Sequence, residues 1–140
     1  MKTFVSALAA LTLATAAPAL AAEPSRLTLT FETGVSTGAV MVALFDSEAA
    51  WSGGAPVRAV RLDVSAGQRT ITFDDLPAGD YGMKAFHDVN GDGEMNTNPF
   101  GMPIEPYAFS NNAVGNMGPA RWEQARFTVT GTAAQTISIR

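Results

Sequence analysis

The segment from Asp88 to Asn96, called the acidic loop below, holds the residues whose types and spacing best suit chemistry. Asp88, Asn90, Asp92 and Asn96 stand at positions 1, 3, 5 and 9 of this segment, and Gly93 stands at position 6. A hard cation such as Ca²⁺ takes roughly six to eight oxygen ligands, and a tight loop turns alternate side chains inward. The acidic loop is therefore a candidate calcium site.

Two further ligands complete this hypothesis. The backbone carbonyl of Glu94 would serve position 7. Pro99 stands where a bidentate Glu would be expected, so Glu105, Asn98 or water would have to supply the last oxygen. The flanking residues lack helical patterns, so the segment is not an EF-hand. Binding would be weak, with a dissociation constant of ~10⁻⁴ to 10⁻³ M. The alternative is a metal-free turn, in which Asn and Asp side chains accept hydrogen bonds from their own backbone.

A catalytic alternative uses the same region. Glu105 with Asp88 or His87 would make a small hydrolase, because paired carboxylates about 5–10 Å apart can cleave glycosides. His87 is the single histidine of the chain and abuts Asp88, so it serves equally well as a hydrogen-bonded residue at the root of the loop. Residues 34–38 match G-x-S-x-G, but strand patterns on both sides exclude a nucleophile elbow. We therefore assign no catalytic residue and expect a protein that is not an enzyme.

Alternating apolar and polar residues predict that strands must position these side chains. Seven short strands with turn signals between them are typical of a sandwich or barrel. A slipped phase between Ala59 and Leu62 suggests a bulge, and the last two strands are expected to pair around Gly131. Short helical turns are expected at residues 46–51, capped by Asp46 or Ser47, and at 119–125, with Pro119 first. The predicted strands are 26–31, 39–45, 57–64, 70–73, 81–87, 126–130 and 136–139.

Between the fifth and sixth predicted strands, residues 88–124 carry no clear strand pattern. The segment contains Phe100, Tyr107, Phe109 and Trp122. Disordered segments are poor in aromatic residues, so we expect one long ordered loop. Its aromatic side chains either form a small core of the loop itself or line a groove for a sugar or peptide.

The N-terminus predicts export. Lys2 precedes an uncharged, Ala- and Leu-rich stretch that ends in Ala19-Leu20-Ala21, which is typical of a secretory signal peptide cleaved after Ala21. A membrane helix is the alternative, because the uncharged run reaches the roughly 20 residues that a span needs. Ser, Thr and Pro within the run favour the signal peptide. We therefore expect a signal at residues 1–21, a single domain at 22–140, and a periplasmic or secreted protein.

The charge and composition of the chain limit the classes of partner that it is expected to bind. Residues 22–140 carry 8 Lys or Arg and 13 Asp or Glu, because Lys2 is the only charge before them, so their net charge is −5. The basic residues are scattered, which argues against nucleic acid as a partner. After signal cleavage no long apolar segment remains, so no membrane insertion is expected. The absence of cysteine means that packing or a bound metal must stabilise the domain. An unidentified protein, peptide or carbohydrate ligand remains the expected partner.

Several motifs stand in the order of a known family. They are His87-Asp-Val-Asn-Gly-Asp-Gly93, Gly101-Met-Pro-Ile-Glu105, Tyr107-Ala-Phe-Ser-Asn-Asn112 and Trp122-Glu-Gln-Ala-Arg-Phe127. With them the chain resembles the domain-of-unknown-function family 2141, small exported bacterial proteins, over essentially all of residues 22–140. The resemblance implies no activity. The family often has Asp at the ninth loop position, where this chain has Asn96, and the missing charge weakens the expected calcium affinity.

A second likeness concerns the fold. The phrase Phe73-x-x-Leu-Pro-Ala-Gly-x-Tyr81 is similar to one in transthyretin-like and collagen-adhesin repeat domains. It implies an all-β, immunoglobulin-like (transthyretin-like) β-sandwich of about seven strands with Tyr81 in the core.

We expect a non-catalytic binding or accessory module of the cell envelope, stabilised by calcium. The alternatives are the small periplasmic hydrolase and a structural envelope protein that acts through a protein partner.

Overall fold

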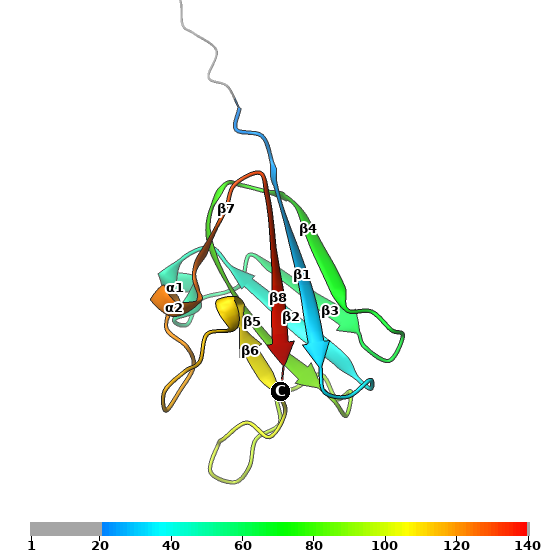
Figure 1. The fold of residues 1–140 in the computed structure, drawn as a ribbon. Coiled ribbons are helices and arrows are strands. Elements are labelled where there is room, and N and C mark those ends of the chain that lie inside the picture. The colour runs from blue at the N-terminus through cyan, green and yellow to red at the C-terminus, as the bar shows by residue number, and fades with distance from the viewer. Residues whose placement is uncertain (1–20, 140) are drawn as a thin grey trace, which may run out of the picture.

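Two β-sheets pack face to face in the computed structural model, which describes residues 21–139 (Figure 1). One sheet has the strand order β4-β1-β8. The other has the order β3-β2-β5-β6, with β7 also paired to β5. The strands are β1 (Ser25–Thr33), β2 (Ala39–Phe45), β3 (Arg58–Asp63), β4 (Thr70–Leu76), β5 (Gly79–Asp88), β6 (Tyr107–Phe109), β7 (Phe127–Val129) and β8 (Thr132–Ile139). The prediction of an all-β sandwich is confirmed.

Three short helical segments complete the fold. They are α1 (Glu48–Trp51), the 3-10 turn η1 (Ser110–Asn112) and α2 (Trp122–Ala125). Within residues 21–139, no helix is long and apolar enough to cross a membrane. The expected signal peptide lies outside the described residues, except for Ala21.

The core lies between the two sheets because alternate side chains of each strand point inward. Leu27, Leu29 and Phe31 of β1 are buried there, and they belong to one cluster with Val42 and Leu44 of β2. Burying each such side chain contributes about 1.5–3 kcal/mol relative to leaving it exposed. Packing of this kind holds together a domain that has no disulfide.

Tyr81 confirms the expectation drawn from the second likeness. Its ring is buried in the core, and its hydroxyl donates a hydrogen bond to the carbonyl of Pro77 at 2.6 Å. The bond fixes the short turn between β4 and β5. It therefore helps to set where β5, and the acidic loop after it, begins.

The prediction that the last two strands pair with each other is wrong. Instead β7 pairs with β5, and β8 runs parallel to β1 in the other sheet. The chain crosses between the sheets at Gly131, whose φ of 65° suits glycine. Gly131 is held by β1, since its carbonyl accepts from the Arg26 N–H (2.7 Å) and its N–H donates to Ser25 Oγ (3.1 Å).

Two other local predictions are corrected. The register between β2 and β3 runs unbroken from Ala39↔Asp63 to Leu44↔Arg58, so the expected bulge is absent from this pair. Because β3 is an edge strand and Val60 is half exposed, its alternation is only weakly constrained. The strand β6 lies within the segment that we expected to be a loop, where three residues pair with β5.

The helical turns are partly as expected. α1 begins where predicted, and Ser47 caps it by accepting from the Ala50 N–H. α2 begins at Trp122 rather than at Pro119. The Ala120 carbonyl accepts a hydrogen bond from the Trp51 indole at 3.0 Å, and Arg121 remains extended. The chain before α2 is therefore held straight instead of helical.

A second hydrophobic cluster, called the Trp51 cluster below, packs on the outer face of the five-stranded sheet. Its ring pairs join Trp51 to Phe45 (5.7 Å), Phe109 (5.9 Å) and Trp122 (6.0 Å) between centroids. The expectation that the long loop forms a core from its own aromatics is therefore wrong in part, because Phe45 and Trp51 come from outside it. Phe100 stays 91% exposed. The buried members are Phe45, Trp51, Phe109, Ala120 and Ala125.

Gly82 should be the most size-sensitive position beneath this cluster. A Cβ there would lie 2.8 Å from the Trp122 ring and 2.9 Å from the Trp51 ring. Trp51 cannot easily move aside, because its indole is hydrogen-bonded to Ala120. We expect Gly82→Ala to lower the free energy of unfolding by about 1–3 kcal/mol in urea titrations.

Gly79→Ala is the matched control, because it lies in the same strand and nothing is within 4 Å of its added Cβ. It should leave stability unchanged or raise it slightly. Equal effects of the two substitutions would contradict the packing described for the Trp51 cluster.

Candidate functional site

Asp88 is buried at the end of β5 and organises the acidic loop from below. Its Oδ1 accepts the backbone N–H groups of Gly91 (2.9 Å) and Asp92 (3.2 Å), and its Oδ2 accepts that of Gly93 (2.8 Å). Gly91 and Gly93 have φ values of 76° and 82°, so glycine permits this sharp reversal. The predicted first calcium ligand thus acts as an acceptor for three backbone donors.

Glu105 closes the same loop from the other side. It is 8% exposed, and its Oε1 and Oε2 accept the backbone N–H groups of Val89 and Asn96, each at 3.0 Å. The structure therefore places Glu105 at the acidic loop, as an acceptor for backbone N–H groups. Its carboxylate bridges the two ends of the loop.

Three of the six predicted ligand residues bring their side chains together. Asn90 Nδ2 lies 2.9 Å from Asn96 Oδ1 and 3.3 Å from Asp92 Oδ2, and Asn96 Nδ2 lies 2.8 Å from the same Asp92 oxygen. Hydrogen bonds from the Glu94 N–H and from the Asn96 side chain lower the pKa of Asp92. Glu94 itself is exposed.

This geometry defines what a cation would need. Among residues 21–139, no group of three or more His, Cys, Asp or Glu side chains is placed to hold a metal ion. A cation would therefore use the Asn90 and Asn96 amide oxygens and backbone carbonyls beside Asp92. Calcium binding stays a prediction.

His87 is fully buried beside the loop. Its Nε2 lies 2.6 Å from the Thr37 carbonyl and so donates to it, whereas its Nδ1 has no hydrogen-bond partner within the described chain. The hydrolase alternative relied on His87, Asp88 and Glu105. None of the three lines the apolar trough described next, or a smaller hollow lined by Glu48 and Trp122.

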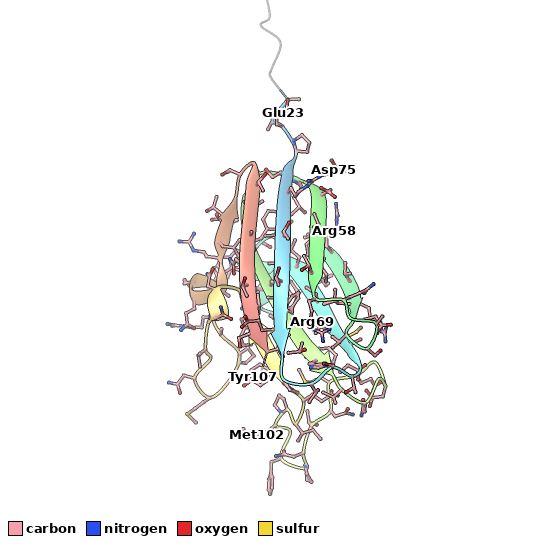
Figure 2. The ribbon with its side chains drawn as sticks, turned by 45° about the vertical axis from the view of Figure 1, so that its right-hand side comes forward. Glu23, Arg58, Arg69, Asp75, Met102 and Tyr107 are labelled. Carbon is pink, nitrogen blue, oxygen red and sulfur yellow. The ribbon has the colours of Figure 1, made fainter. Side chains whose placement is uncertain are left out.

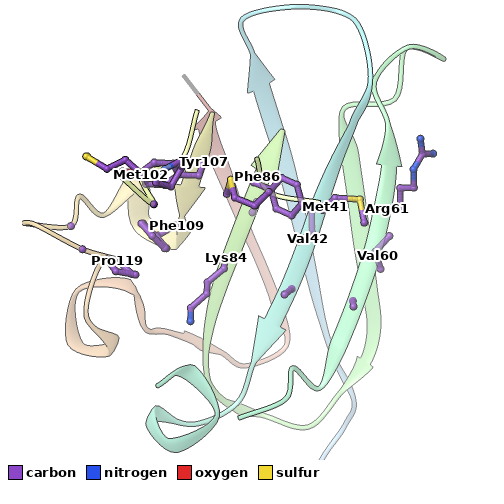
Figure 3. Close-up of a pocket in the computed structure, with 18 of the residues that line it drawn as sticks. Met41, Val42, Val60, Arg61, Lys84, Phe86, Met102, Tyr107, Phe109 and Pro119 are labelled. Carbon is purple, nitrogen blue, oxygen red and sulfur yellow. The ribbon is translucent and has the colours of Figure 1, made fainter. Parts of the chain in front are cut away.

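An apolar trough of about 1070 Å³ lies on the outer face of the five-stranded sheet (Figure 3). Its floor carries Met41 and Ala43 of β2 opposite Phe86 and Lys84 of β5, because these side chains point away from the core. Loop residues rise along the β6 side. The full lining is Met41, Val42, Ala43, Ala59, Val60, Arg61, Lys84, Ala85, Phe86, Met95, Gly101, Met102, Pro103, Tyr107, Phe109, Gly115, Met117, Gly118 and Pro119.

Methionine is concentrated in this trough, so we call it the methionine trough. Four of the six methionines line it, namely Met41, Met95, Met102 and Met117. Figure 2 shows Met102 on the loop beyond Tyr107, at the end of the molecule away from Glu23. Flexible, polarisable thioethers adapt to partners of different shape and are common at binding surfaces.

The alternative that loop aromatics line a groove holds for Tyr107 and Phe109, which line this trough, but not for Phe100 or Trp122. The methionines of the trough were not predicted from the sequence. The sequence did contain one signal for an apolar binding surface. Several large apolar residues stand in polar, Gly-rich loop segments, where their side chains have no hydrophobic core to pack into. In the structure five of them are exposed: Phe100, Met102, Ile104, Val114 and Met117. Of these five, Met102 and Met117 line the trough. Contiguous exposed apolar side chains are typical of interaction sites.

Lys84 lies at one end of the methionine trough, next to the Trp51 cluster. Its Nζ donates to the Trp51 carbonyl at 2.6 Å and stands 4.5 Å and 4.8 Å from the centroids of the Trp51 and Phe45 rings. Burial lowers the pKa of this ammonium, because the charged form is partly removed from water. The trough therefore combines a long apolar surface with one half-buried cation.

The role of Asp88 is tested by removing its carboxylate. We expect Asp88→Ala to lower the free energy of unfolding by about 1–3 kcal/mol in metal-free buffer, since three backbone donors lose their acceptor. Amide hydrogen exchange of Gly91–Gly93 should also accelerate. Glu94→Ala is the control and should change stability by less than about 0.5 kcal/mol, because its side chain is exposed. If Asp88→Ala behaves like the control, Asp88 does not hold the loop.

Comparison with known proteins supports the resemblance stated from the motifs. The family model described as "Uncharacterized protein conserved in bacteria (DUF2141)" matches residues 32–138, which include the five-stranded sheet, the acidic loop, the methionine trough and only the end of β1. No curated protein matches the sequence. The chain belongs to this bacterial family, DUF2141.

Proposed function

We propose that this chain is an exported, non-catalytic binding module of the bacterial cell envelope, and that it holds the apolar part of its ligand in the methionine trough. The carrying observation is the convergence of four methionines from three separate segments on one hollow. Ligand-binding sites of roughly 300–1,000 Å³ are usually apolar with a few polar groups, and this trough of about 1070 Å³ is slightly larger than that range.

The non-catalytic role is supported by what the titratable groups near the loop contact. Asp88 and Glu105 accept backbone N–H groups, and His87 donates to a backbone carbonyl. These bonds hold the loop that carries Met95 and Met102 on the trough wall. Export rests on the signal-like residues 1–21, and the site of action is then the periplasm or the extracellular space.

The proposal predicts that a neutral apolar probe binds and that blocking the trough prevents it. N-phenyl-1-naphthylamine should bind the purified protein with increased fluorescence. Ala59 is exposed on β3 and lines the trough. We expect Ala59→Trp to weaken probe binding by about tenfold or more, because the indole fills space that the ligand needs.

Ala134→Trp is the matched control, since Ala134 is also an exposed strand alanine but lies on β8 of the other sheet. It should leave probe affinity unchanged. If the parent does not bind the probe, or if both variants bind it equally well, the proposal fails. The exposed apolar loop residues would then point to the alternative of an envelope protein that acts through a protein partner.

The calcium prediction has its own test, because a cation in the acidic loop would stiffen one wall of the trough. With a dissociation constant of ~0.1 mM, about 10 mM CaCl₂ should add roughly 2.7 kcal/mol of stability relative to EDTA. For a domain of this size the Tm should rise by roughly 10 °C. MgCl₂ is the control cation, and Asp92→Asn should remove the response. Identical melting in EDTA and CaCl₂ would mean that the hydrogen bonds alone order the loop.

A further inference from the structure

The charged groups in the methionine trough have an unusual distribution. The two charged side chains that line it, Lys84 and Arg61, are both cationic, although the chain has a net charge of −4. Arg61 stands at the far rim and lies 4.0 Å from Asp63. Figure 3 shows Arg61 at the edge of the lining on the β3 side, and Lys84 between it and the loop residue Pro119.

Lys84 differs from Arg61 in having no acidic partner within 4.0 Å among residues 21–139. The ion pairs of this part of the chain are Arg26–Asp74, Arg61–Asp63 and Arg126–Asp80. On its other side Lys84 borders a smaller hollow whose lining includes Glu48, Arg121 and Glu123, yet neither glutamate comes within ion-pair distance. One of the three N–H donors of Lys84 is used, by the Trp51 carbonyl.

We propose that the ligand of the methionine trough is an unbranched alkyl carboxylate, a fatty acid, whose head pairs with Lys84 and whose chain lies across Phe109 and Phe86 toward Met41 and Met102. This inference rests on the proposed function and names its ligand class. A half-buried ammonium without a counter-charge is unfavourable, and a carboxylate that accepts its free N–H groups would relieve that penalty.

The apolar lining favours an alkyl chain. Beyond Lys84, the trough presents thioether, aromatic and aliphatic side chains from both its floor and its loops (Figure 3). A flexible chain gains affinity from each methylene that it buries, by about fourfold per group. The methionine side chains can adjust around chains of different length, because each has three rotatable bonds.

The test compares three ligands that share one chain and differ in their heads. Dodecanoate, dodecan-1-ol and dodecyltrimethylammonium should each be titrated, below micelle formation, against the bound neutral probe at about pH 8, where the carboxylate is ionised. We expect dodecanoate to bind about tenfold more tightly than dodecan-1-ol, and the cation to bind most weakly. Decanoate should bind about sixteenfold more weakly than dodecanoate, because it lacks two methylene groups.

Variants assign the preference to Lys84. Lys84→Met keeps an unbranched apolar side chain but removes the charge. It should lower the affinity for dodecanoate to that for dodecan-1-ol, and the affinity for dodecan-1-ol should stay as in the parent protein. Lys84→Arg should keep the preference. Arg58→Met is the control, because Arg58 is an exposed residue of β3 outside the trough lining. Circular dichroism checks folding, and the ranking of ligands by the parent protein tests the inference even if Lys84→Met does not fold.

The outcomes separate the two levels of the proposal. If the parent protein binds dodecanoate and dodecan-1-ol equally well, the inference that the ligand has a carboxylate head is wrong. The proposed function, an apolar binding site in the trough, would still hold. Probe binding that neither ligand displaces would assign the trough to another occupant, such as an apolar peptide. A preference that survives in Lys84→Met would also overturn the inference. If the neutral probe itself does not bind, the proposed function fails, and the fatty acid fails with it.

Discussion

Five backbone N–H groups of the segment after β5 donate to just two carboxylates, those of Asp88 and Glu105, and the rest of the binding face depends on this arrangement. A long connection must satisfy its buried backbone donors before it can be ordered. Once these donors are satisfied, the chain that follows is fixed relative to β5, and it presents Met95 and Met102 beside the sheet. The second wall depends on Trp51, whose indole binds the Ala120 carbonyl and so holds the segment that carries Met117.

These two anchors give an ordinary sandwich an unusual outer face. Most exposed sheet faces are polar, but here Met41, Phe86 and Tyr107 lie in register across three neighbouring strands. The next outward row contains Ala43, Lys84 and Phe109, so the only charge in that row is a half-buried ammonium. The hydrophobic core stabilises the fold between the sheets, and the outer rows together with the two loops form the surface on which we place function. The acidic loop then serves as a support for that surface, with or without a cation.

The sandwich was predictable from the sequence because burial of one face of each strand produces a local alternation of apolar and polar residues, as at Leu27 and Leu29. The strand β6 was not predictable, because its three residues form a strand only by pairing with β5. The structure brings Asp88 and Glu105 to one loop. Their spacing in the sequence could not distinguish a cation from a set of backbone N–H groups, since both require carboxylate oxygens that point into the loop. A groove lined by the loop residues Tyr107 and Phe109 was among the sequence-based alternatives, but the methionines of the trough were not predicted, because its lining comes from segments far apart in the sequence. No periodic pattern links Met41 to Met117, and only the fold brings them together.

The most direct test of the central claim is an NMR titration of protein labelled at the methionine methyl groups, with dodecan-1-ol as a ligand that is neutral and apolar. Met83 provides an internal control, because it is fully buried in the core between the sheets. The account predicts that the methyl signals of Met41, Met95, Met102 and Met117 shift together with one binding constant, while that of Met83 stays in place. Shifts confined to the exposed loop residue Met117, or a shift of Met83 alone, would contradict a shared trough on the outer face of the sheet.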